Sequence, residues 1–207
     1  MNNKGATGIA TAILLIAFIL ISATAASVLM NDSGPQYEKN YEELLDDTLN
    51  QISTYIQIKD VLGKYTSNTE EQQIQKIAIL IKPLFSIDID TSQLLIQINN
   101  GKQIKILSYN NHAEFILSHS LFEHPLWQTM NENTFSFIPI LDKDQSIIKY
   151  NTINDNTDIV YIILQLSNDF AMQKGENLEI TLFPATGITK TITLTAPLPI
   201  KNVVSLY

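Results

Sequence analysis

Three histidines lie close together along the chain, and imidazole is the side chain that proteins most often use to bind metals. They are His112, His119 and His124, with Glu114 and Glu123 between them. On a helix, His119 and Glu123 would lie one turn apart, where they could share an ion. The spacing of the three imidazoles puts them on no common helical face, so we expect structural or surface roles for them.

Two further acidic residues, Asp142 and Asp144, alternate along the chain with Ser146 and offer the oxygen ligands that Ca²⁺ prefers. The run lacks the glycine and the terminal glutamate of an EF-hand loop, and a solvated turn is therefore favoured. The same holds for Asp88 and Asp90. The sequence predicts no cofactor and no metal site, with Asp142 and Asp144 as the only weak candidates.

Catalytic motifs are missing from the sequence. It contains neither Gly-x-Ser-x-Gly nor His-Glu-x-x-His, and Gly63-Lys64 and Gly101-Lys102 lack the upstream glycine of a phosphate-binding loop. With no cysteine, thiolate catalysis, disulfide bonds and zinc fingers are excluded. We expect a protein that is not an enzyme.

The charge balance excludes another class of function. The chain has 207 residues and a net charge of −8, and all of its 13 basic residues are lysines. An acidic chain without arginine lacks the usual means of gripping phosphates, so nucleic acid is not an expected partner. Since 45% of the residues are hydrophobic, the chain can form a folded core.

The most informative element is the apolar segment from Gly5 to Asn31, which contains no charged residue. A helix over residues 6–30 would be about 37 Å long, enough to cross a bilayer. Its large side chains point to every side of such a helix, which therefore needs lipid or protein around it. The residues expected to be buried there are Ile9, Ile13, Leu14, Ile16, Phe18, Ile19, Leu20, Ile21 and Leu29.

Three fates are open to this segment. It could stay as a permanent single-span anchor, which requires only its length. It could be discarded as a secretion signal cut near the small residues Ala23-Thr24-Ala25. In the third fate only a short leader is removed, and the apolar segment becomes the N-terminus of the mature protein.

The third fate is supported by a resemblance. Lys4-Gly5 followed by Ala6-Thr7-Gly8 resembles the start of archaeal flagellins (archaellins), whose class III signal peptide is type IV pilin-like and ends in Lys-Gly or Arg-Gly. The resemblance implies a leader over residues 1–5, which a prepilin-peptidase-like enzyme removes between Gly5 and Ala6. Bacterial-type pilins usually carry a glutamate where this chain has Ala10, and this difference favours an archaellin.

Beyond the apolar segment, residues 31–35 contain Gly34 and Pro35 and are expected to break the helix. Residues 36–60 then show the three- and four-residue spacing of an amphipathic helix, so a helical region over residues 6–60 is predicted. After Gly63 the pattern changes to short runs rich in Ile, Thr and Val. These runs are residues 74–82, 94–98, 103–107, 135–141, 159–166, 178–183 and 188–195.

The runs predict an α+β fold, in which a long N-terminal hydrophobic α-helix is followed by an antiparallel β-sandwich (Ig-like) head over residues 64–207. Asn99-Asn100-Gly101-Lys102 between two alternating runs predicts a hairpin. Residues 108–133 could hold a short helix. Residues 142–146 with Asn154 and 158–160, then 184–187, 195–197 and 203–207, also resemble the C-terminal part of archaellins.

The resemblance implies a structural subunit of the archaeal flagellum (archaellum), which polymerises with copies of itself and with other archaellins for swimming motility. It implies an extracellular filament and a transient precursor in the cytoplasmic membrane. The alternatives are a minor or adaptor archaellin, an adhesive pilin, or a single-span anchored β domain that binds a surface partner. Asn31, in the sequon Asn31-Asp32-Ser33, is a candidate for N-glycosylation.

Overall fold

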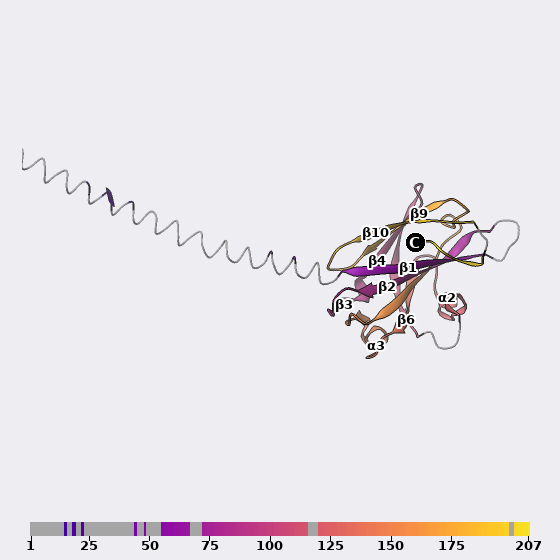
Figure 1. The fold of residues 1–207 in the computed structure, drawn as a ribbon, viewed down its shortest axis with the longest axis horizontal. Coiled ribbons are helices and arrows are strands. Elements are labelled where there is room, and N and C mark those ends of the chain that lie inside the picture. Colours follow the sequence, from indigo (N-terminus) through magenta and orange to yellow (C-terminus); the bar gives the residue numbers. More distant parts are fainter. Residues whose placement is uncertain are drawn as a thin grey trace, which may run out of the picture. The chain divides into compact units, whose positions relative to one another are not determined.

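The computed structural model describes residues 55–66, 72–115, 120–198 and 201–207, together with the single residues 15, 18, 19, 22, 44 and 48. The chain divides into an N-terminal unit, Met1–Leu49, and a second unit, Asn50–Tyr207, which we call the head. Figure 1 shows the strands and short helices of the head.

The head is built mainly from one nine-stranded sheet with the order β10-β9-β4-β5-β6-β8-β2-β1-β11. Its strands are β1 (Ile56–Tyr65), β2 (Ile74–Pro83), β4 (Leu95–Asn99), β5 (Ile104–Ala113), β6 (Thr134–Leu141), β8 (Ile159–Gln165), β9 (Asn177–Phe183), β10 (Lys190–Thr195) and β11 (Val203–Ser205). Strands β3 (Ile89–Asp90) and β7 (Thr152–Ile153) form a separate pair. The short helices are η1 (Thr91–Gln93), η2 (Leu121–Glu123), α2 (Leu126–Thr129) and α3 (Ser146–Tyr150).

The core lies on the inner face of this sheet. In strand β2, Ile77, Ile79 and Ile81 alternate along the inner face and are fully buried. Val61 of β1 and Leu194 of β10, near opposite ends of the strand order, belong to the same core cluster. The sheet therefore curls around its own core into a sandwich-like head, so the expected β-sandwich is confirmed in this coarser form.

The curl also brings the β10 edge to the beginning of β1. Lys190 Nζ donates to Tyr55 Oη over 3.3 Å, and the ammonium lies 5.8 Å from the centre of the Tyr55 ring. At the other end of β1, Tyr65 Oη donates to the carbonyl oxygen of Pro197. Both contacts join segments far apart in the chain, so they hold the sheet in its curled form.

The sequence predicted an antiparallel sheet, but one pair of neighbouring strands is parallel. Strands β5 and β6 pair in parallel, with Ser108 opposite Thr134 and Tyr109 opposite Phe135. Parallel neighbours need a crossover of a dozen or more residues. The segment between Ala113 and Thr134 provides it, and it contains η2 and α2. The short helix expected within residues 108–133 is therefore confirmed as α2.

The predicted end of the helical region is wrong. Residues 56–60, the last part of the expected amphipathic helix, belong to strand β1, which pairs with β2 from Ile56 to Tyr65. The head thus begins its sheet at Ile56 and not after Gly63. Apolar residues at 52, 55 and 56 suit a helical period locally, but the long ladder with β2 decides the conformation.

The hairpin between β4 and β5 is confirmed. Gly101 has a φ of 81°, which favours glycine over other residues. Asn99 Oδ1 accepts from the N–H of Gly101, and Asn100 Oδ1 accepts from the N–H groups of Lys102 and Gln103. The asparagine side chains therefore satisfy the backbone of this turn.

Candidate functional site

The described residues of the N-terminal unit are helical, and their large apolar side chains face solvent. The exposed fractions are 64% for Leu15, 73% for Phe18, 59% for Ile19 and 62% for Leu44. Ser22 Oγ donates to the carbonyl oxygen of Phe18 over 2.7 Å, so this hydroxyl is satisfied within its own helical turn. Exposed large apolar side chains of this kind are typical of an interaction surface.

Of the residues expected in the polymerisation core, the structure describes only Phe18 and Ile19. Outside the described residues lie Lys4, Gly5, Ala6, Ile9, Ile13, Leu14, Ile16, Leu20, Ile21, Leu29 and Asn31. Their roles in leader cleavage, assembly and glycosylation stay predictions. Among the residues that the structure does describe, no helix combines the length and the apolarity needed to cross a membrane.

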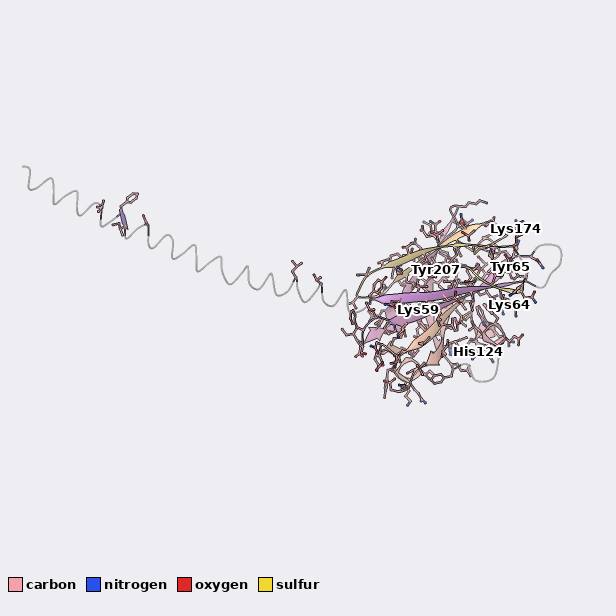
Figure 2. All side chains as sticks on the ribbon, in the orientation of Figure 1. Lys59, Lys64, Tyr65, His124, Lys174 and Tyr207 are labelled. Carbon is pink, nitrogen blue, oxygen red and sulfur yellow. The ribbon has the colours of Figure 1, made fainter. Side chains whose placement is uncertain are left out.

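The histidines do not form a metal site in the described residues. His124, labelled in Figure 2, is buried. Its Nε2 lies 3.1 Å from the carbonyl oxygen of Phe115, and its Nδ1 accepts from the N–H of Leu126. An accepting Nδ1 leaves Nε2 as the donor, so the neutral ring bridges two backbone groups. His112 is exposed, and His119 lies outside the described residues. A structural role is therefore confirmed for His124.

Asp142 differs from the solvated turn that we expected, whereas Asp144 is exposed as expected. Asp142 is buried, and its carboxylate accepts hydrogen bonds from the N–H groups of Ser146 and Ile147, the first residues of α3. Asp144 accepts from Ser146 N at 3.1 Å and from Asn154 Nδ2 at 2.8 Å. The two carboxylates therefore organise the backbone of the loop between β6 and β8.

Asp158 closes the same loop from its far end. It is buried and accepts from the N–H groups of Asn154 and Asp155 at 3.2 and 3.1 Å. Burial raises the pKa of Asp158 and of Asp142, whereas the hydrogen bond from Asn154 is the main cause that lowers the pKa of Asp144 to about 2. Within the described ranges, no group of three or more His, Asp or Glu side chains could hold a metal ion.

The outer face of the sheet is covered over only part of its width. Ala78, Ile138 and Ile163, on the outward side of β2, β6 and β8, are fully buried in a cluster with Phe122, Leu126, Trp127 and Met130. Across β9, β4 and β5, four large side chains stay partly exposed, and the sequence pattern did not single them out. They are Leu95, Ile104, Ile106 and Phe183, which we call the strip.

Known proteins show the same fold and the same sequence pattern. A family model described as archaeal-type flagellin matches residues 5–194. Flagellin B1 of Methanococcus voltae is 32% identical over 84% of this chain and 79% of its own length. Flagellin B3 of Thermococcus kodakarensis is 25% identical over 84% of this chain and 78% of its own length.

Solved structures agree with this match. The crystal structure of flagellin FlaB1 from Methanocaldococcus jannaschii superposes with a TM-score of 0.65 at 20% identity, over 73% of this chain and 95% of that chain. A structure of the archaeal flagellum of Methanospirillum hungatei superposes with a TM-score of 0.53 at 14% identity, over 97% and 99% of the two chains. The chain therefore belongs to the archaeal-type flagellin family, and it is a structural subunit of the archaeal flagellum.

Proposed function

We propose that this flagellin polymerises through its apolar segment, residues 6–30, which packs with the same segment of other copies along the axis of the filament. The exposure of Leu15, Phe18 and Ile19 in the single chain carries this proposal. The head, which encloses its own core, then covers the outside of the filament. The partners are further copies of this chain and other archaellins, in an extracellular filament whose rotation propels the cell.

The free energy of covering apolar side chains favours burial of the segment. Covering one large apolar side chain contributes about 1.5 to 3 kcal/mol relative to water. The same side chains are equally satisfied by lipid tails, so the membrane stores the precursor until assembly. Once the segment is in the bundle, close packing of the helices is the main source of favourable free energy. Extracting the segment from the membrane requires energy supplied by another protein, such as an ATPase.

The contact between subunits repeats along the filament without closing into a ring. A head-to-tail contact whose rotation does not close into a ring produces an open helical polymer. Removal of the leader takes away the charge of Lys4, so the mature subunit is more acidic than the precursor, whose net charge is −8. Like charges on the surface then keep neighbouring filaments apart.

Maturation at Gly5 is the second part of the proposal. A prepilin-peptidase-like enzyme cuts before Ala6, and Asn31 accepts a glycan where the chain leaves the apolar segment. Mass spectrometry of native filaments tests both, because the N-terminal peptide should begin at Ala6 and the peptide with Asn31 should be heavier by a glycan. A start at Met1 would instead indicate a permanent anchor, and a start near Ala26 would indicate ordinary secretion.

The assembly test uses the full chain with Ile19→Asp. A carboxylate in the bundle would be desolvated without a partner, so we expect filaments to be absent from the cells. Electron microscopy counts the filaments, and Ile19→Leu is the matched control that should assemble normally. Circular dichroism should show an unchanged head in both variants, since Ile19 lies in the N-terminal unit. Normal filaments from Ile19→Asp would refute the buried bundle.

A further inference from the structure

The strip formed by Leu95, Ile104, Ile106 and Phe183 crosses three neighbouring strands of the head. Leu95 lies directly opposite Phe183 across the β4–β9 ladder, and Gln97 and Asn99 lie opposite Ile106 and Ile104 across the β4–β5 ladder. The exposed fractions are 64% for Ile104 and 61% for Ile106. Because cross-strand neighbours on one face lie about 5 to 8 Å apart, the four side chains make one continuous surface.

Strand formation alone does not require these isoleucines. Strand β10 satisfies the same preference for β-branched residues on the same outer face with Thr191, Thr193 and Thr195. Threonine would serve equally at 104 and 106 without exposing a large apolar side chain. The apolar character at these two positions is therefore better explained by a contact.

The outer face around the strip is almost free of charge. On the outward side of β9, β4, β5 and β10, Glu179 is the only charged residue among the paired positions. Several polar side chains there also pair with each other, with 3.0 Å between the hydroxyls of Thr181 and Thr191 and 2.7 Å between Thr195 Oγ1 and Asn177 Oδ1. Little solvation is lost when such a surface is covered.

This neutrality indicates what covers the strip. Copies of a chain with a net charge of −8 repel one another, so they approach most easily where a surface carries no charge. Among the described residues, the short helices η2 and α2 already pack on β2, β6 and β8. The apolar segment of a neighbour is also committed, to the bundle proposed above.

We propose that the strip is a contact site for the head of a second copy of this chain in the filament. This inference rests on the proposed function, because it requires assembled filaments. It adds a contact between heads to the burial of the N-terminal segment, and it assigns Ile104 and Ile106 as the centre of that contact.

The test uses the absence of cysteine from the chain. Ile106→Cys and Tyr150→Cys each introduce a single thiol, the second at a side chain that is 74% exposed on α3 and is not part of the strip. Maleimide labelling rates are measured in filaments and in full-length subunits kept in detergent. We expect the ratio of the Ile106→Cys rate to the Tyr150→Cys rate to fall about tenfold in filaments. An unchanged ratio would overturn the inference.

A photo-cross-linker attached to the thiol of Ile106→Cys identifies what lies against the strip. A cross-linked peptide from the head of a second copy would support the inference, and a peptide from another polypeptide would overturn it. Failure of the unsubstituted chain to form filaments would overturn both this inference and the proposed function. Filaments in which the strip is labelled freely would overturn this inference alone.

Discussion

In the head, Ile77 and Ile79 of β2 are fully buried, whereas Leu15, Phe18 and Ile19 of the N-terminal unit are all more than half exposed. The residue types are the same, but only the head has a sheet that curls around them. The head therefore completes its own apolar core within one chain. Under the proposed function, lipid or other copies cover the exposed apolar side chains of the N-terminal unit, so burial of that segment would belong to assembly and not to folding of the head.

The largest loss of stability in the head is expected from Phe137→Ala. Phe137 is fully buried and packs edge-on against Tyr109 and Phe135, with ring centroids 5.0 and 5.6 Å apart. Removing a buried aromatic ring lowers the free energy of unfolding by about 3 to 5 kcal/mol. Denaturant unfolding of the head measures the loss, and Phe183→Ala, at a partly exposed position, should cost much less.

The same variant sharpens the difference between the two units. If assembly depends on the N-terminal segment, Phe137→Ala should still give filaments at temperatures where its head is folded. Filaments that are lost while circular dichroism shows a folded head would mean that the head core contributes directly to assembly.

A smaller effect is expected from Gly63→Ala. A Cβ atom at Gly63 would lie 2.8 Å from Leu206 Cδ1 and 3.0 Å from Ile74 Cγ2, closer than atoms in contact normally approach. Overpacking of this kind costs about 1 to 3 kcal/mol. Thermal unfolding of the head should show the loss. The double variant Gly63→Ala with Leu206→Ala should lose less than the sum of the two single variants, and strict additivity would contradict the clash.

The smallest effect is a pH dependence that comes from Asp158. Its pKa is raised in the folded head by burial, so the folded state holds its proton more tightly than the unfolded state. The head should therefore gain stability as pH falls from neutral toward the ordinary range of aspartate, and the gain should level off below that range. The expected change in Tm is a few degrees at most.

The control for this pH dependence is Asp158→Asn, which keeps an oxygen that accepts from the N–H groups of Asn154 and Asp155. The difference in Tm between the two proteins should grow as the pH is lowered, in favour of the unsubstituted head. At lower pH, protonation of Asp144, whose pKa is about 2, acts in the opposite direction in both proteins. A difference that stays constant with pH would show that Asp158 does not titrate as expected.

Local sequence determined several features of the molecule. The uncharged run from Gly5 to Asn31 indicated a segment that needs lipid or protein around it, and Lys4-Gly5 pointed to the archaellin family, which the family match confirms. Asn99-Asn100-Gly101 specified the hairpin because its conformation depends on neighbouring residues alone. The alternating runs located most of the strands for the same reason.

Other features were decided only by the tertiary structure. Residues 56–60 suit either a helix or a strand, and pairing with β2 selected the strand. The order of the strands, including the parallel pair β5 and β6, depends on the path of the crossover between them. The periodicity of apolar residues in the sequence carries no information about that path. Likewise, Asp142 is buried because α3 begins at its carboxylate, and Ile104 and Ile106 are exposed because α2 covers a different part of the sheet. Periodicity tells which residues share a face, but burial depends on what packs against that face, and this is set by contacts between segments distant in the chain.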